Sequence, residues 1–178
     1  MAIKTNKTEE IIEIKPVENV STVIRIVVDT REKPHAITKI LAYFDKHGIE
    51  AVRMKLDIGD YMTAPPGRVS VDRKQNLGEV VGNVCQQHKR FTAECLRAKE
   101  TGIKLIFLVE HGGQIKTLED VREWENPRLD YSPYAVSGKR LYQIMKTYEA
   151  KYGVRWEFCD KRSTGRRIVE LLKEDEKY

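Results

Sequence analysis

The 178-residue chain has few cysteines and no long apolar segment, and each absence excludes a class of protein. Its three cysteines, Cys85, Cys95 and Cys159, are an odd number without a CxxC pair, so neither a disulfide framework nor a structural zinc site is expected. We interpret them as reduced thiols in or near the core. No apolar run approaches the roughly 18 residues that a membrane span needs, and no signal peptide is recognisable. The sequence predicts a cytosolic or nuclear protein without a membrane partner.

Length and composition favour one globular domain with a tail. At about 150 residues per domain, 178 residues correspond to a single domain. Hydrophobic residues make up 40% of the chain and charged residues 33%, which is typical of a soluble protein. Residues 1–22 carry a net charge of −1 and one apolar cluster, Ile11, Ile12 and Ile14, and we interpret them as a flexible N-terminal tail. The expected domain is residues 23–178.

The positive charge is concentrated in the C-terminal third. The whole chain has a net charge of +5, whereas residues 139–167 alone hold nine basic and three acidic residues, a net of +6. Two interpretations remain open, a solvated helix face and a face that binds phosphates. The candidates for phosphate contacts are Lys139, Arg140, Lys161, Arg162, Arg166 and Arg167.

The spacing of apolar residues predicts strands and helices in alternation. Strands are predicted at residues 23–28, 52–56, 69–74, 103–109 and 154–159, with a hairpin between residues 61–63 and 69–74. Helices are predicted at residues 34–47, 76–100, 117–124, 137–152 and 164–172, with a loop at 126–132. In the long helix at 76–100, His88 falls on the apolar face. This alternation predicts an α/β domain of three layers with a central mixed sheet.

Three short motifs combine carboxylates with basic side chains. They are Asp29-Thr30-Arg31-Glu32, Gly59-Asp60 and Asp72-Arg73-Lys74. On a strand, residues 72 and 74 point to one face and residue 73 to the other. With Asp60 nearby, this set would form a hard oxygen site for Mg²⁺ or Mn²⁺, leaving Lys74 to position water or offset phosphate charge. A structural salt bridge is an equally good interpretation of these residues alone.

Taken together, the motifs resemble the nuclease domain of XPF, Hef and related structure-selective endonucleases. The resemblance spans about residues 23–172 and rests on residues 28–32, 56–61, 71–74, 89–91 and 105–110. It implies a restriction-endonuclease-like core of the PD-(D/E)XK class, dependence on Mg²⁺ or Mn²⁺ without a small-molecule cofactor, and cleavage of branched, flapped or forked DNA. The processes implied are DNA repair, recombination or phage DNA processing. A homodimer is one possible assembly, and the implied location is the nucleoid of a bacterium or phage-infected cell, or a eukaryotic nucleus.

The resemblance also implies roles for individual residues. Asp60 and Asp72 would be metal ligands, Lys74 the catalytic lysine, and Asp29 a further group on the metal or its waters. The carbonyl of Arg73 would be an additional ligand.

Further roles follow for the charged residues around this centre. Glu32 would also support the metal or its waters, while Arg31 and Arg73 would hold the acidic cluster. An alternative for Asp29 and Glu32 is capping of the helix that begins near Pro34. The DNA-binding candidates are Arg31, Arg90, Lys139, Arg140 and Arg162.

Two departures from the family pattern leave alternatives open. Asp72 stands where the family usually has Glu, and the side chain is one methylene shorter. Only six residues follow Leu172, so no tandem helix-hairpin-helix module is expected. A non-catalytic DNA-binding or dimer-partner subunit with the same fold is therefore an alternative, as is a sheet domain whose charges form only salt bridges. The intact set of Asp60, Asp72 and Lys74 favours the enzyme.

Overall fold

A six-stranded sheet forms the centre of the computed structural model, which describes residues 24–174. The predicted tail at residues 1–22 lies outside the described residues. The strands are β1 (Arg25–Val28), β2 (Glu50–Arg53), β3 (Tyr61–Ala64), β4 (Val69–Lys74), β5 (Lys104–Glu110) and β6 (Arg155–Cys159). Their order across the sheet is β2-β1-β3-β4-β5-β6, and β3 alone runs against its neighbours. The predicted mixed sheet and the hairpin of β3 and β4 are confirmed.

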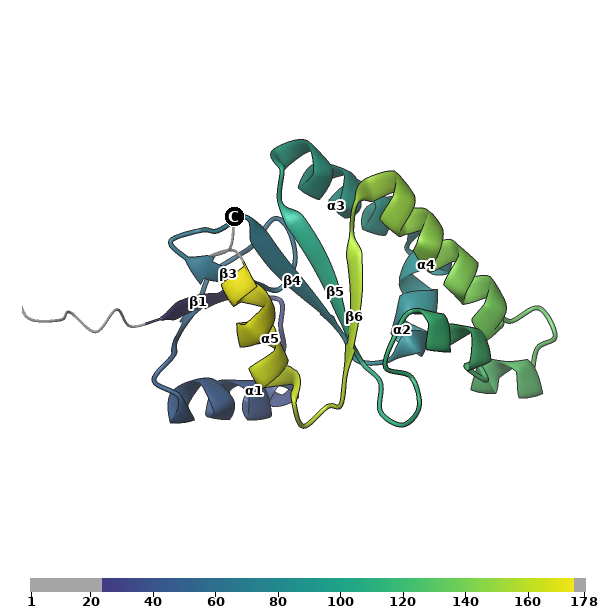
Figure 1. The fold of residues 1–178 in the computed structure, drawn as a ribbon, viewed down its shortest axis with the longest axis horizontal. Coiled ribbons are helices and arrows are strands. Elements are labelled where there is room, and N and C mark those ends of the chain that lie inside the picture. The colour runs from purple at the N-terminus through teal and green to yellow at the C-terminus, as the bar shows by residue number, and fades with distance from the viewer. Residues whose placement is uncertain (1–23, 175–178) are drawn as a thin grey trace, which may run out of the picture.

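Helices cover both faces of this sheet and complete the predicted three-layer α/β architecture (Figure 1). They are α1 (Pro34–Lys46), α2 (Leu77–Val81), the π-helix η1 (Gly82–Gln86), α3 (His88–Thr101), the 3-10 helices η2 (Glu119–Glu123) and η3 (Pro127–Asp130), α4 (Gly138–Tyr152) and α5 (Thr164–Leu172). Helices α1 and α5 pack on one face, and α2, α3 and α4 pack on the other. None of the helices within residues 24–174 is long and apolar enough to cross a bilayer.

Strand β5 shows why the sheet needs two helical layers. Its residues from Leu105 to Glu110 are all buried, as expected for a central strand in a mostly parallel sheet. Leu105 and Phe107 pack toward α3 and α4, whereas Ile106 and Leu108 pack toward α1 and α5. The alternation of side chains along a strand therefore supplies both cores from one continuous apolar run.

The sheet topology gathers polar residues at one edge. Strands β1, β4, β5 and β6 run in the same direction, so their carboxyl ends lie at the same edge. Asp29 follows β1, Lys74 ends β4, Glu110 ends β5 and Asp160 follows β6. In α/β sheets, ligands bind beyond the carboxyl ends of the strands. This edge is where a site is expected.

The single helix predicted at residues 76–100 is wrong, because it is divided in three. A five-residue π-turn, η1, separates α2 from α3. A π-turn bonds each residue to the fifth one along and so interrupts the regular α-helical repeat. His88, predicted on the apolar face, is exposed at the start of α3, and Cys85, predicted in or near the core, lies within η1 and is exposed too.

Smaller differences concern the ends of elements. Strand β2 ends at Arg53, so the predicted strand at residues 52–56 is displaced. The predicted helix at residues 117–124 is a 3-10 helix, and the predicted loop at 126–132 contains another. Thr164 is the first residue of α5 and does not cap it, because its hydroxyl donates to Glu110 Oε1 over 2.8 Å.

Candidate active site

A polar pocket of about 190 Å³ opens where β4 ends beside α2 and α3. The two predicted metal ligands, Asp60 and Asp72, and the predicted catalytic lysine, Lys74, line it together. The full lining consists of Arg31, Glu32, Asp60, Asp72, Arg73, Lys74, Glu79, Asn83, Gln87, Arg90, Phe91, Glu94 and Arg97. The mixture of carboxylates and cations makes this pocket a candidate for chemistry on a charged substrate.

Asp72 and Lys74 lie on the same face of β4, as the strand period predicts. Lys74 Nζ is 2.6 Å from Asp72 Oδ1 and about 5.5 Å from the ring centre of Phe107. Burial raises the pKa of Asp72 to about 6, although the Lys74 ammonium opposes this shift. Burial alone would lower the pKa of Lys74, but Asp72 outweighs it and the pKa is raised. Lys74 is therefore a charged donor held beside a carboxylate.

A glycine turn brings Asp60 to the same pocket. Gly59 has φ +69°, and a Cβ there would overlap Ser70 Oγ, so only glycine fits. The Gly59 N–H donates to Glu94 Oε1 over 2.9 Å, and the Arg73 N–H donates to Asp60 Oδ2 over 2.9 Å. Burial first, and then the neighbouring Asp72 carboxylate, raise the pKa of Asp60 well above its usual value.

Arg73 points to the opposite face of β4 and forms a buried ion network. Its Nε donates to Glu32 Oε2 over 2.9 Å, and its Nη1 donates to Glu110 Oε2 over 3.2 Å. The Tyr61 hydroxyl also donates to Glu32 Oε2, over 3.0 Å. The Arg73 side chain is only 3% exposed. This network fixes the strand that carries Asp72 and Lys74, and it ties Glu32 to Arg73.

Asp29 is separated from the pocket, although the sequence grouped it with the metal ligands. Its Oδ1 accepts from the Arg31 N–H and Nε, and its Oδ2 accepts from Arg31 Nη2 and the Leu56 N–H. Burial would raise the pKa of Asp29, but these hydrogen bonds outweigh it and the pKa is lowered. Neither Asp29 nor Glu32 caps α1, because Lys33 occupies the N-cap position without a side-chain bond. Asp29 instead joins β1 to the segment before Gly59.

We expect Asp29→Asn to destabilise the fold without reducing metal affinity. The amide cannot accept as many hydrogen bonds, so the loss is about 2 kcal/mol of unfolding free energy at neutral pH. Because the folded pKa of Asp29 is lowered, the wild-type advantage is present above the unfolded pKa and disappears as the pH falls through the folded one. Urea denaturation at neutral and acidic pH measures the loss of stability and its dependence on pH. Unchanged stability with weaker Mn²⁺ binding would make Asp29 a ligand.

The pocket offers oxygen donors that suit a hard divalent cation. Within residues 24–174, no three His, Cys, Asp or Glu side chains form a ready metal-binding group. Asn83, which lines the pocket, nevertheless has a buried Oδ1 that makes no hydrogen bond, and Asp72 Oδ1 is engaged by the Lys74 ammonium at 2.6 Å. Mg²⁺ typically uses one or two carboxylates and completes its shell with water and substrate. Asp60 and Asp72, together with Asn83, fit such a cation, which would also favour the charged carboxylates.

The helical wall of the pocket was missed by the sequence analysis. The residues concerned are Glu79, Asn83, Gln87, Glu94 and Arg97, with the predicted Arg90 among them. They recur every three or four positions through α2, η1 and α3. This polar stripe beside the apolar stripe was the sequence pattern from which the pocket wall could have been predicted. A π-turn within such a wall is frequent at functional sites.

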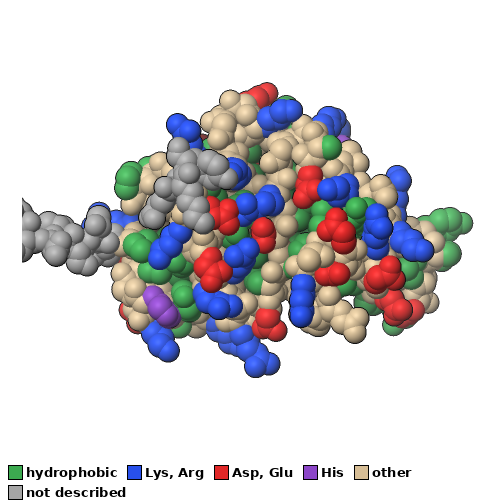
Figure 2. Space-filling view, in the orientation of Figure 1, with side chains coloured by type: hydrophobic (Ala, Val, Ile, Leu, Met, Phe, Trp, Pro, Cys, Tyr) green, Lys and Arg blue, Asp and Glu red, His purple; other side chains and the backbone are tan. Residues whose placement is uncertain are grey.

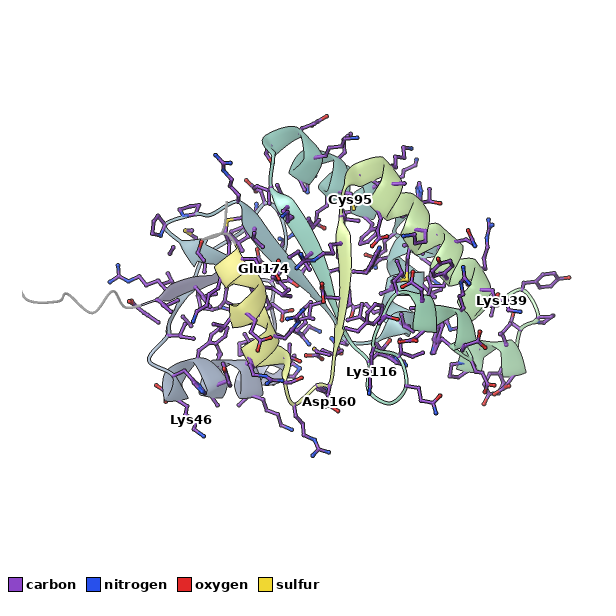
Figure 3. All side chains as sticks on the ribbon, viewed as in Figure 1. Lys46, Cys95, Lys116, Lys139, Asp160 and Glu174 are labelled. Carbon is purple, nitrogen blue, oxygen red and sulfur yellow. The ribbon has the colours of Figure 1, made fainter. Side chains whose placement is uncertain are left out.

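The predicted DNA-binding residues divide into two groups. Arg31 and Arg90 line the pocket, although Arg31 Nη2 also donates to the Leu56 carbonyl over 2.7 Å. Lys139, Arg140 and Arg162 lie outside it and are exposed. Lys139 lies at the N-terminal end of α4, and Asp160, close to Arg162 in sequence, lies just beyond β6 (Figure 3).

Much of the basic segment at residues 139–167 is paired within the protein. Arg155 contacts Glu157 and Glu174, and Arg167 contacts Glu157 and Glu170. Figure 2 accordingly shows basic and acidic side chains interspersed over this face. The further pairs in this region are Lys146 with Glu149 and Arg166 with Glu170. The +6 segment is therefore less available to phosphates than its sequence suggests.

Comparisons with known proteins agree with this architecture. A family model described as the ERCC4 domain matches residues 28–170. No curated protein matches the sequence. The solved structure "XPF from Aeropyrum pernix" is similar with a TM-score of 0.59 and 22% identity, over 85% of this chain and 65% of that one. A second, "XPF from Aeropyrum pernix, complex with DNA", has a TM-score of 0.57 and 21% identity, over 86% of this chain and 66% of that one. The chain thus spans just under two thirds of each matched structure, and the predicted fold is confirmed.

Proposed function

The chain belongs to the ERCC4 domain family, a family of DNA nucleases, and we propose that it is a metal-dependent DNA endonuclease. One observation carries the proposal: Asp60, Asp72 and Lys74 line one pocket, in which the Lys74 ammonium lies 2.6 Å from Asp72 Oδ1 and the buried Asn83 Oδ1 makes no hydrogen bond. A sheet domain held only by salt bridges has no need to recess two carboxylates with raised pKa values beside each other.

Asp60 and Asp72 are the residues proposed to hold Mg²⁺ or Mn²⁺, with Asn83 close to them in the pocket lining. The cation, when bound, offsets the charge that develops on the phosphate oxygens. The Lys74 ammonium, fixed by Asp72 at 2.6 Å, is positioned to orient a water or to donate a hydrogen bond to the phosphate. Arg90 and Arg97 are exposed residues of the pocket lining, and their positive charge would attract the DNA backbone.

The proposed substrate is branched, flapped or forked DNA. One of the matched proteins is described as a complex with DNA, and this supports DNA as the partner proposed for this chain. The test is incubation of flapped, forked and linear duplexes with Mg²⁺, with Mn²⁺ and with EDTA. We expect cleavage of branched substrates with either metal and none in EDTA. Binding of the same substrates without cleavage would favour the alternative, a non-catalytic DNA-binding or dimer-partner subunit.

The proposed context is DNA repair, recombination or phage DNA processing, in the nucleoid or in a eukaryotic nucleus. A homodimer is part of the same proposal and is measured by sedimentation equilibrium. Cleavage by a strictly monomeric protein would contradict the proposed dimer but not the proposed active site.

Lys139 and Arg140 are expected to contribute electrostatically to DNA binding. Both are exposed in the first turn of α4, and no ion pair within the described residues engages them. Replacing both by Glu should weaken duplex binding and reduce the slope of log affinity against log salt by about 1 to 2. The matched control is Arg166→Glu, since Arg166 already faces Glu170 at 3.7 Å. An unchanged salt slope in the double variant would mean that Lys139 and Arg140 form a solvated helix face and do not contact DNA.

A further inference from the structure

Two adjoining cavities, here called the tyrosine groove, lie outside the candidate active site. They measure about 480 and 440 Å³ and share walls formed by Val81, Gln86, Asn126 and Arg128. The groove runs between the helical segment 76–86 and residues 124–136. The sequence did not predict this groove, because no motif marks it.

The groove carries unusually exposed aromatic rings. Tyr131 is 89% exposed and Tyr134 is 95% exposed, and both line one of the two cavities. Trp124 lines the other. Figure 2 shows hydrophobic side chains protruding at the end of the molecule where the segment before α4 lies. Large apolar surfaces left in water beside a cavity are typical of binding sites.

The charge of the groove suits an anionic ligand. Neither cavity has an acidic residue in its lining, whereas Arg128 lines both and His111 lines one. The side chains of Arg128 and Gln86 make no hydrogen bond to other described residues. A cation, an amide and exposed rings together match a nucleotide, which offers a phosphate, polar base edges and a flat base.

The groove and the candidate active site share one helical segment as a wall. Asn83 and Gln87 line the polar pocket, while Gly82 and Gln86 line the groove. Adjacent residues of a helix point about 100° apart, so the two cavities lie on neighbouring sides of this segment. A DNA strand that left the pocket across η1 would reach the tyrosine groove.

We propose that the tyrosine groove binds unpaired nucleotides of the DNA strand adjoining the cleavage position, by stacking bases on Tyr131 and Tyr134 and holding a phosphate at Arg128. Bases within a duplex already stack on one another and cannot lie flat on these rings. The groove therefore selects single-stranded segments beside a junction. The link between the tyrosine groove and cleavage rests on the proposed function. The binding of single strands by the groove does not depend on that function.

The test measures fluorescence anisotropy of a labelled oligothymidylate in EDTA, so that no cleavage occurs. The double variant Tyr131→Ala/Tyr134→Ala should bind at least about fivefold more weakly, because one stacked base contributes about 1 kcal/mol or more. Tyr131→Phe/Tyr134→Phe keeps both rings and should bind as the wild type does. Met54→Ala is the control for loss of an exposed apolar side chain elsewhere, since Met54 is 49% exposed.

An abasic oligomer of the same length separates stacking from charge. It should bind the wild type and the double alanine variant equally, and Arg128→Ala should weaken both oligomers. Equal affinity of wild type and double alanine variant for oligothymidylate would overturn the proposal. An equal loss of affinity for oligothymidylate and for the abasic oligomer in the double alanine variant would also overturn it. The same holds if the double alanine variant changes only self-association, measured by sedimentation. If the tyrosine groove binds single strands, Asp72→Asn should bind oligothymidylate as the wild type does, whether or not the protein is a nuclease.

Discussion

Lys74→Met is expected to slow DNA cleavage by about 10³-fold, because it removes a fixed positive charge from the reacting phosphate. The side chain is only 9% exposed and is held 2.6 Å from Asp72 Oδ1. It therefore contributes little to the encounter with DNA, and affinity for an uncleavable substrate should change by less than about twofold. Single-turnover cleavage and anisotropy, measured on the same preparation, separate the two effects.

The matched control for Lys74→Met is Lys46→Met. Lys46 is an exposed lysine at the end of α1 (Figure 3) and is not part of the pocket lining, so its loss should leave cleavage unchanged. Lys74→Arg is a second control, since it keeps the charge with a different shape. Cleavage by Lys74→Met at the wild-type rate would contradict the catalytic role and leave Lys74 as a structural partner of Asp72.

Arg73→Met is expected to lower the free energy of unfolding by about 3–5 kcal/mol, the usual effect of removing one partner from a buried ion pair. The change leaves Glu32 and Glu110 without their shared cation, and the Glu110 side chain is only 2% exposed. Thr164 and Tyr61 still donate to these carboxylates, but neutral donors offset less of the charge. Chemical denaturation measures the difference.

The control for Arg73→Met is Arg25→Met, which breaks an exposed ion pair. Arg25 Nε is 2.6 Å from Glu50 Oε2, and the two side chains are 58% and 49% exposed. Solvent screens this pair, so its loss should change stability by less than about 1 kcal/mol. Equal effects of the two substitutions would mean that the Arg73 network does not hold β4 in place.

The sequence predicts the core of the candidate site because short-range rules decide it. The two-residue period of a strand places Asp72 and Lys74 on one face and Arg73 on the other, and the structure has this arrangement. The position of Asp60 follows from the Gly59 turn and from the pairing of β3 with β4. The fold class follows from the alternation of strands and helices.

The rest depends on contacts between distant segments, which spacing along the chain does not specify. Asp29 is engaged by the Leu56 N–H, 27 positions away, so its isolation from the pocket was not predictable. The Gly59 N–H donates to Glu94 of α3, 35 positions away. Likewise, Arg155 pairs with Glu174, which follows α5, and Arg167 pairs with Glu157 on β6. The charge count alone therefore overstated the basic surface.

The proposed active site is tested most directly by single-turnover cleavage of a forked duplex in Mg²⁺, comparing the wild type with Asp72→Asn. Asn keeps the size of Asp72 but loses the negative charge that a cation needs. The account predicts metal-dependent cleavage by the wild type and a loss of about 10³-fold in the variant, with DNA binding retained. Cleavage by Asp72→Asn at the wild-type rate, or DNA binding by the wild type without any cleavage, would contradict it.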